Sequence, residues 1–238
     1  MDTLKVNTIY PAYMGEVNKF GIGVPCVFVR LAGCNIRCYK KTLGVLCDTP
    51  EALEMHSGKD MSAEDIFGEV KKYDAKIVCL TGGEPLMQNV SGLLSILTEN
   101  GLSVVVETNG TRRVALYRMP GVSFVVDYKS KSSGCEELML NQYKGLTEDD
   151  FLKFVLYDRA DYEYFKAFVL CKVCGFTEAK IAVGLFWGAK IGYQELISWL
   201  IADEIYDRVY LNMQTHKMAV LHDEKIGELQ KLFIPKEL

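Results

Sequence analysis

The segment AKIVCLTGGEPLMQNVSGLLSILTENGLSVVVET, residues 75–108, contains two apolar runs separated by a helical stretch. The runs 75–82 and 102–108 are continuous rather than alternating, as in parallel strands that are buried on both faces. Between them, residues 86–101 end in Gly101, a residue type that commonly follows the end of a helix. The segment therefore predicts a strand–helix–strand unit with two parallel strands.

The same alternation continues along the chain. Five further apolar runs are predicted to be strands, namely 25–31, 122–128, 151–157, 180–187 and 207–212. Three further stretches are predicted to be helices, namely 61–73, 159–172 and 193–204. Ser62 and Asp65 resemble a capping box at the start of the first of these helices. Because there is no linker, internal repeat or low-complexity tract, we expect one α/β domain over residues 1–238, an open sheet or partial barrel.

The bulk composition argues against several classes of protein. Hydrophobic residues make up 49% of the 238 residues and charged residues 24%, as in ordinary globular proteins. The net charge of −4 gives no basic field, so we expect neither nucleic acid nor a membrane as a partner. No apolar run approaches the roughly 18 residues of a membrane span. Residues 1–10 lack the basic start and apolar middle of a signal peptide, so we expect a cytoplasmic protein.

Eight cysteines without an export signal do not indicate a secreted disulfide framework. Cys26 and Cys79 lie inside apolar runs and are predicted to be small core residues. Cys171 and Cys174 form a single CxxC, which we assign to a buried helix end. Cys135 has no nearby partner in the sequence and receives no role. The segment GCNIRCYKKTLGVLCDT (33–49) holds the remaining three, Cys34, Cys38 and Cys47.

Three cysteines on one loop point to an iron–sulfur cluster. A disulfide needs two, and a closed structural zinc site needs four ligands. Three thiolates can hold three irons of a [4Fe–4S] cube and leave the fourth iron open for a small molecule. The amino and carboxylate groups of S-adenosylmethionine (SAM) suit that open iron.

Polar motifs follow each of the first four predicted strands: Cys34, TGGEP (81–85), ETNGT (107–111) and DYKSKSSG (127–134). Ligands of parallel α/β folds bind at the carboxyl ends of the strands, so these loops predict one shared site. Gly82 and Gly83 permit close backbone approach, and Glu84 can accept hydrogen bonds from a ligand ammonium group. Taken alone, TGGEP would equally suit a strand-to-helix turn.

The cysteine loop together with TGGEP resembles the radical SAM superfamily, whose usual signature is CxxxCxxC followed by a GGEP-like motif. Cys34 and Cys38 keep the first spacing, but eight residues rather than two precede Cys47. The extra residues, within 39–46, must loop out for Cys47 to reach the cluster. Cys47-Asp48-Thr49 matches the CDT ending of one family, 7-carboxy-7-deazaguanine synthase, which acts in the route to queuosine and other deazapurines.

The resemblance to the 7-carboxy-7-deazaguanine synthases covers most of the chain. The segment MGEVNKFGIGVPCVFVRLAGC (14–34) is similar to the start of the family pattern, with Met14 where Gln is usual and Val17 where Gly is usual. ETNGT, KSKSSG (129–134) and MQTHK (213–217) are similar to later family motifs, in the same order. The resemblance implies a mostly parallel, partial (β/α) barrel of the radical SAM type.

The resemblance also implies a reaction and its cofactors. In this family, 6-carboxy-5,6,7,8-tetrahydropterin is contracted to 7-carboxy-7-deazaguanine with loss of ammonia. A reduced [4Fe–4S] cluster cleaves SAM, and the resulting radical takes a hydrogen atom from the substrate. The resemblance further implies Mg²⁺ at the substrate carboxylate, an electron donor such as a flavodoxin or ferredoxin, and a homodimer.

The family motifs assign roles residue by residue. The cluster ligands are Cys34, Cys38 and Cys47, and Thr49 is the expected hydroxyl ligand of Mg²⁺, with Asp48 nearby. The residues expected to bind SAM are Gly82, Gly83, Glu84, Thr108, Asn109, Lys129 and Ser132.

The substrate residues come from both ends of the chain. Glu16 is expected to accept two parallel N–H bonds from the pterin. Arg30, embedded in an apolar strand, has the planar fork that suits a carboxylate. The other expected substrate residues are Met14, Gly15, Gln214 and His216.

Two other functions remain open on the sequence alone. GCNIRC (33–38) would also suit another small radical SAM enzyme, such as an activase that installs a glycyl radical on a protein partner. A non-catalytic zinc module would use the three cysteines and His56, and it would be colourless where an iron–sulfur protein is brown. Residues 217–238 extend past the last motif, and their pattern predicts a C-terminal helical extension.

Overall fold

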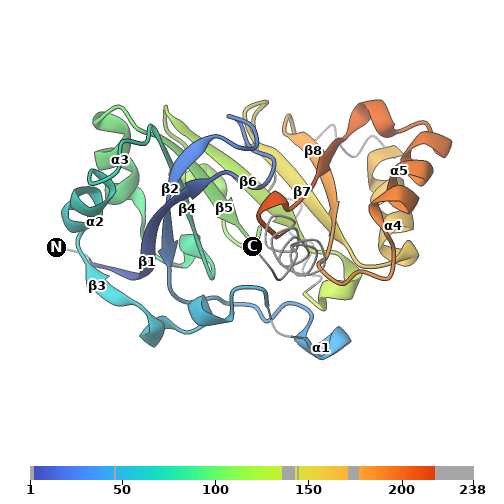
Figure 1. Cartoon of the computed structure of the whole chain (residues 1–238), viewed down its shortest axis with the longest axis horizontal. Helices are drawn as coiled ribbons and strands as arrows, with labels where there is room; N and C mark the ends of the chain where they lie inside the picture. Colours follow the sequence, from blue (N-terminus) through green and yellow to red (C-terminus); the bar gives the residue numbers. More distant parts are fainter. Residues whose placement is uncertain (1–2, 46, 136–142, 144, 171–176, 218–238) are drawn as a thin grey trace, which may run out of the picture.

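The computed structural model describes residues 3–45, 47–135, 143, 145–170 and 177–217. Cys171, Cys174 and the predicted helix over 218–238 lie outside the described residues. Nine strands form one mixed sheet in the order β3-β1-β2-β4-β5-β6-β7-β8-β9 (Figure 1). From β2 to β9 all neighbours are parallel, so the predicted mostly parallel α/β fold is confirmed.

The bounds of the strands are β1 (Leu4–Tyr13), β2 (Pro25–Leu31), β3 (Lys59–Met61), β4 (Ile77–Gly82), β5 (Ser103–Thr108), β6 (Val122–Tyr128), β7 (Phe151–Leu156), β8 (Lys180–Leu185) and β9 (Tyr210–Asn212). The seven predicted strands are confirmed, with ends shifted by three residues at most. Two strands were not predicted, β1 and β3, which pair antiparallel with each other, and β1 also pairs antiparallel with β2. Pro11 and exposed side chains in β1 obscure its pattern in the sequence.

The helices are α1 (Lys40–Leu43), α2 (Ala63–Val70), α3 (Ser91–Glu99), α4 (Arg159–Leu170) and α5 (Tyr193–Ala202). The capping box before α2 is confirmed, because Asp65 N donates to Ser62 Oγ at 3.1 Å and Ser62 N donates to Asp65 Oδ2 at 3.2 Å. Helix α3 begins five residues later than predicted, because Pro85–Met87 first forms a 3₁₀ turn. In Figure 1, α2 and α3 pack at one end of the curved sheet, and α4 and α5 pack at the other.

The two faces of the sheet differ in chemistry. The outer face, toward the helices, is apolar and includes Val29, Leu80, Val106, Val126 and Phe154. The inner face has an apolar layer that includes Cys26, Cys79, Val105, Val125 and Phe151, so Cys26 and Cys79 are core residues as predicted.

Further along these strands, two residues beyond the apolar layer or more, the inner face becomes polar. The residues at these positions are Arg30, Thr81, Glu107, Asp127 and Lys153. This polar layer is the floor of the candidate site.

In the part of the chain that the structure describes, the sheet stays open, and the loop after β1 is bonded to the segment after β9. Thr215 N, after β9, donates to Gly15 O, after β1, at 3.0 Å. Val17 N donates to Asn212 Oδ1 at 2.9 Å. The result is a partial barrel whose mouth carries the polar layer.

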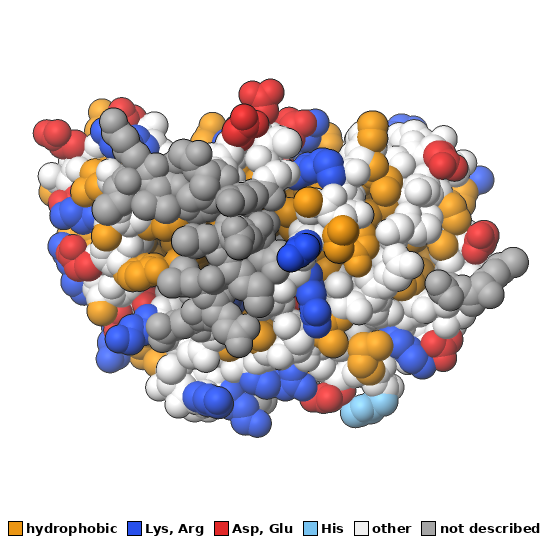
Figure 2. Space-filling model, turned by 180° about the vertical axis from the view of Figure 1, so that it is seen from behind, with side chains coloured by type: hydrophobic (Ala, Val, Ile, Leu, Met, Phe, Trp, Pro, Cys, Tyr) orange, Lys and Arg blue, Asp and Glu red, His pale blue; other side chains and the backbone are white. Residues whose placement is uncertain are grey.

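The visible part of one molecular face shows acidic and basic side chains interspersed (Figure 2). In the part of the chain that the structure describes, none of the helices is long and apolar enough to cross a membrane.

Candidate active site

The cysteine loop leaves the carboxyl end of β2 and is held by backbone hydrogen bonds to two other segments. Cys34 N donates to Leu53 O at 3.0 Å, and Tyr39 N donates to Ser133 O at 2.7 Å. The additional residues between the second and third cysteines contain the short helix α1. The loop is therefore fixed against the segment that follows β6, which begins with KSKSSG (129–134).

The three thiols of this loop are half-buried and free. Burial raises the pKa of each thiol, that of Cys47 to about 11, so bound iron would have to drive their deprotonation. Within the described residues, no three Cys, His, Asp or Glu side chains converge closely enough to hold one metal ion. In a [4Fe–4S] cluster each thiolate binds a different iron, so the three thiols need not converge on one point to hold it. His56, the fourth ligand of the zinc alternative, is exposed.

TGGEP packs directly against the cysteine loop. Gly83 N donates to Leu31 O at 3.1 Å, and Glu84 N donates to Gly33 O at 2.8 Å. A Cβ atom at Gly83 would lie 2.3 Å from Gly33 O, and one at Gly82 would lie 2.1 Å from Leu31 O. The two glycines therefore let the backbone of TGGEP come close to the end of β2 and to the cysteine loop, as the predicted close backbone approach requires.

The side chain of Glu84 joins TGGEP to ETNGT. Its carboxylate is fully buried and accepts hydrogen bonds from Leu86 N at 3.0 Å, Thr108 Oγ1 at 2.8 Å and Asn109 N at 2.6 Å. Burial raises the pKa of the Glu84 carboxyl. Asn109 Nδ2 in turn lies 3.8 Å from Cys34 Sγ. Glu84 and Thr108 therefore hold Asn109 beside the cysteine loop.

Lys129 and Ser132 lie on the fourth strand end. Lys129 Nζ is 2.6 Å from Asp127 Oδ2, and neighbouring Asp127 raises the pKa of this lysine despite its burial. Ser132 N donates to Asp161 Oδ1 at 3.2 Å, at the start of α4. Both residues are held at the carboxyl end of β6, close to the cysteine loop, with Asn109 on the neighbouring strand end.

Glu16 lies across the barrel mouth, in the loop after β1. Its Oε2 atom accepts from Lys153 Nζ at 2.6 Å and from Asn212 Nδ2 at 3.0 Å, and its Oε1 atom accepts from Gln214 Nε2 at 2.9 Å. Burial by itself raises the pKa of the Glu16 carboxyl, but the charge of Lys153 and these hydrogen bonds outweigh burial and lower it to about 2. Glu16 is therefore an ionised carboxylate in a fixed orientation.

Three other residues predicted to bind substrate surround Glu16 or lie beneath it. A Cβ atom at Gly15 would lie 2.5 Å from His216 Nδ1, so glycine allows the imidazole to pack on the backbone. Burial lowers the pKa of His216, which keeps the ring neutral at neutral pH. Met14 is 1% exposed and belongs to the apolar inner layer, with its N–H donating to Val24 O at 2.9 Å.

Arg30 lies in the polar layer on β2, and Thr49 follows the third cysteine of the cysteine loop. Arg30 Nη2 donates to Tyr10 Oη at 3.1 Å, and among the described residues Arg30 forms no salt bridge. Its guanidinium is thus available to a carboxylate. Thr49 precedes a 3₁₀ turn (Pro50–Ala52) without capping it through its hydroxyl. Asp48 pairs with Lys217 at 2.7 Å.

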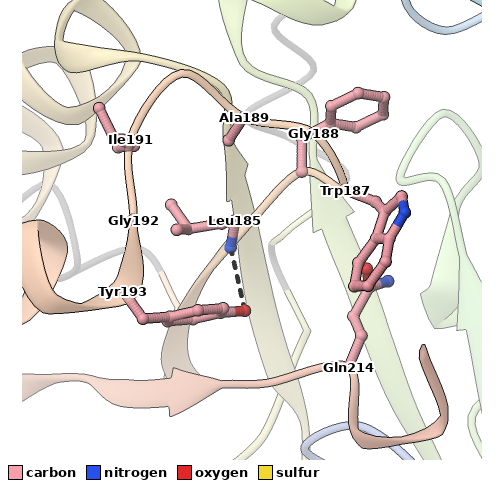
Figure 3. A pocket seen from close by; sticks show the side chains of 9 residues that line it. Leu185, Trp187, Gly188, Ala189, Ile191, Gly192, Tyr193 and Gln214 are labelled. Atoms are coloured by element: carbon pink, nitrogen blue, oxygen red, sulfur yellow. Dashed lines mark hydrogen bonds between the residues drawn. The ribbon is translucent and has the colours of Figure 1, made fainter. Parts of the chain in front are cut away.

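A cavity of about 190 Å³ lies between the end of β8, the start of α5 and Gln214. Figure 3 shows the side chains of Trp187 and Gln214 next to each other on one side of it, and Tyr193 on the other, where Leu185 N donates to Tyr193 Oη at 3.4 Å. Gln214 Oε1 accepts from Lys217 Nζ at 2.9 Å. Gln214 therefore connects this cavity with Glu16.

Five polar residues of the site were not singled out in the sequence, namely Thr81, Glu107, Asp127, Lys153 and Asn212. Lys153 interrupts the apolar strand FLKFVL, just as Arg30 interrupts PCVFVRL. A charged residue inside an apolar strand was the signal that singled out Arg30, and it would also have found Lys153. No comparable signal marks Asn212.

Comparisons with known proteins agree with the resemblance that is seen in the sequence. Residues 20–116 match the family model described as "4Fe-4S single cluster domain". The 7-carboxy-7-deazaguanine synthase of Koribacter versatilis is 33% identical, and the match covers 90% of this chain and 96% of that protein. The protein of the same name from Methanospirillum hungatei is 32% identical, covering 92% and 86%. The crystal structure of QueE from Escherichia coli has a TM-score of 0.68 at 24% identity and covers 89% of this chain and 94% of that chain, which shows a common fold.

Proposed function

Because the chain belongs to the 7-carboxy-7-deazaguanine synthase family, we propose that it contracts 6-carboxy-5,6,7,8-tetrahydropterin to 7-carboxy-7-deazaguanine with loss of ammonia. The observation that carries this proposal is the ionised, fixed carboxylate of Glu16 at the same sheet edge as the three thiols. Similarity to these relatives over nearly the whole chain leaves neither the activase nor the zinc module with support.

The cluster and SAM would occupy the side of the mouth formed by the cysteine loop. We assign Cys34, Cys38 and Cys47 as the cluster ligands. When bound, the reduced cluster and SAM supply the radical chemistry that starts the ring contraction. The groups assigned to SAM are the backbone at Gly82 and Gly83 and the side chains of Asn109, Lys129 and Ser132, with Glu84 and Thr108 holding Asn109 in place.

The pterin would occupy the side formed by Glu16. A carboxylate that is ionised and already oriented is a good acceptor for the N–H groups of a guanidine-like edge, because no ordering is required on binding. Arg30, without a carboxylate partner among the described residues, is assigned to the substrate carboxylate. Gly15, Gln214 and neutral His216 form the wall behind Glu16, and Met14 supports this wall through the apolar layer.

The metal ion, the electron donor and the oligomeric state are proposed from the family resemblance. We assign a Mg²⁺ ion to the Thr49 hydroxyl, since this hard ion is commonly held by few protein oxygens together with water and substrate. The same resemblance supports a flavodoxin or ferredoxin as electron donor, and a homodimer. The cytoplasm is the proposed compartment, because free thiols persist where the surroundings are reducing.

The test is an anaerobic assay of reconstituted protein with SAM, Mg²⁺, a reductant and 6-carboxy-5,6,7,8-tetrahydropterin. We expect 7-carboxy-7-deazaguanine and 5′-deoxyadenosine from the wild type, and neither product from a Cys47→Ala variant. Cys26→Ala is the control, because Cys26 is a core thiol of β2 that is not assigned to the cluster, and this variant should keep its iron and activity.

Each other outcome has a distinct meaning. SAM cleavage without deazaguanine would keep the radical chemistry but reject the pterin as substrate, with Met14 the first position to replace by Gln. A colourless protein that binds zinc and no iron would reject the proposal altogether.

A further inference from the structure

Lys153 is a buried cation at the β7 end of the polar layer. It lies on β7, is 8% exposed, and points into the barrel from the wall opposite Arg30. Its Nζ atom is 2.6 Å from Glu16 Oε2 and 3.2 Å from Asp127 Oδ1. One ammonium group is therefore shared by the carboxylate assigned to the pterin and by a carboxylate on the SAM side.

The surrounding charges make Lys153 the cation on which Glu16 depends. Lys129, directly after β6, is bound to Asp127 at 2.6 Å, and Arg30 on β2 is bound to Tyr10. On β5, Glu107 is a further acid near Glu16, and it accepts a hydrogen bond from Thr81. Behind Glu16, burial lowers the pKa of His216, so its ring adds no positive charge at neutral pH.

We propose that Lys153 is a positioning residue for the pterin: it keeps the Glu16 carboxylate ionised and fixed, so that Glu16 accepts the N–H groups of the substrate. This inference rests on the proposed function. Lys153 itself need not touch the substrate, because its contacts within the described chain are made to Glu16 and Asp127.

The proposal predicts a specific change in pH dependence. Without the ammonium group, burial and the nearby acid Glu107 would raise the pKa of Glu16 toward the working range. The protonated carboxyl loses acceptor strength, so pterin affinity should fall as the pH falls through the new pKa. Asp127 retains Lys129 as a partner, so affinity for SAM should change little.

The experiment measures pterin dissociation constants anaerobically between pH 6 and pH 8.5, on protein with an oxidised cluster and no reductant, so that no turnover occurs. The variants are Lys153→Met, which keeps the shape of the chain without its charge, and Lys153→Arg, which keeps the charge. Lys166→Met is the matched control, because Lys166 on α4 pairs with Asp203 at 2.6 Å on the outside of the barrel. SAM dissociation constants are measured on the same samples.

For Lys153→Met we expect pterin binding to weaken by about tenfold for each pH unit below the new pKa of Glu16. The wild type and Lys166→Met should bind equally well across this range, and Lys153→Arg should largely restore the wild-type behaviour. If the Met variant does not fold, Lys153→Gln, which is neutral but can still donate to Glu16, is measured in the same way.

Two results would overturn the inference. One is unchanged pterin binding in the folded, uncharged variant. The other is a weakening that is the same at every pH, which would mean that Lys153 acts by another route. A wild type that neither binds nor converts the pterin would reject the proposed function instead. In that case, ¹³C NMR titration of the Glu16 carboxyl in wild type and Lys153→Met decides whether Lys153 keeps it ionised.

Discussion

At Gly83 the backbone of the cysteine loop leaves no space for a side chain. A Cβ atom would lie 2.3 Å from Gly33 O and 2.6 Å from Ala52 O, and backbone atoms cannot move away as a flexible side chain would. We therefore expect Gly83→Ala to displace the cysteine loop and to lower iron content and visible absorbance after anaerobic reconstitution.

Gly92 provides the matched control for that substitution. It lies in α3, and nothing lies within 4 Å of a Cβ atom built there. Gly92→Ala should keep full iron content and gain roughly 0.5–1 kcal/mol of stability, because alanine loses less backbone entropy in a helix. Equal iron content in both variants would show that the contact at Gly83 does not shape the cluster loop.

Arg30 is expected to affect the binding of the pterin and not that of SAM. If its guanidinium binds the substrate carboxylate, Arg30→Gln should weaken pterin binding by about 10- to 100-fold, because a charge-assisted pair contributes roughly 1.5–3 kcal/mol. SAM binding should change little. Calorimetric titration of both ligands tests this, with exposed Arg112→Gln as control. A loss in SAM affinity that equals the loss in pterin affinity would contradict the assignment.

Among the elements, α2 is the one whose start is set by a local signal. The Ser62 hydroxyl accepts from Asp65 N at 3.1 Å. Ser62→Ala should lower the free energy of unfolding by about 1 kcal/mol, the usual value of a helix N-cap. Chemical denaturation measures the change, and enzyme activity should be retained because α2 lies at the outer face of the sheet, away from the mouth.

The control for the cap is Ser91, at the start of α3. This helix begins without a side-chain cap, and Ser91 lies one position inside it. Ser91→Ala should therefore change the unfolding free energy by only a few tenths of a kcal/mol. If the two alanine variants lose equal stability, the hydrogen bond at Ser62 is not the cause.

For the whole molecule, the bridge between the two ends of the sheet should be sensitive to acid. Lowering of the Glu16 pKa from 4.5 to about 2 means that this carboxylate stabilises the fold above pH 4.5 and that the contribution is lost as the pH falls toward 2. We expect Glu16→Gln to reduce the drop in melting temperature between pH 6 and pH 3. Thermal unfolding followed by circular dichroism measures this.

Glu163 serves as the matched carboxylate in that experiment. It pairs with Arg159 on the surface of α4, and both side chains are 48% exposed. An exposed pair contributes little to stability, so Glu163→Gln should follow the wild type across the whole pH range. An acid response of Glu16→Gln equal to that of the wild type would mean that the bridge does not depend on this ionised carboxylate.

Much of this protein could be predicted from local sequence. Continuous apolar runs identified seven of the nine strands, and the spacing of Ser62 and Asp65 identified the start of α2. The expectation that Cys34, TGGEP, ETNGT and KSKSSG would lie at one sheet edge was correct, because the carboxyl ends of parallel strands share an edge. The roles of individual site residues and the single-domain organisation remain predictions.

The tertiary structure alone decided how the site residues are held. Glu16 meets Lys153, 137 residues away, and Asn212, 196 residues away, so no local pattern could pair them. Strand β1 exists because β2 and β3 supply its partners, and its own alternation is interrupted by Pro11. Local propensity and helix capping depend on neighbours along the chain. The ionisation of Glu16 depends instead on the register of the sheet, because the register determines which distant strand ends face each other.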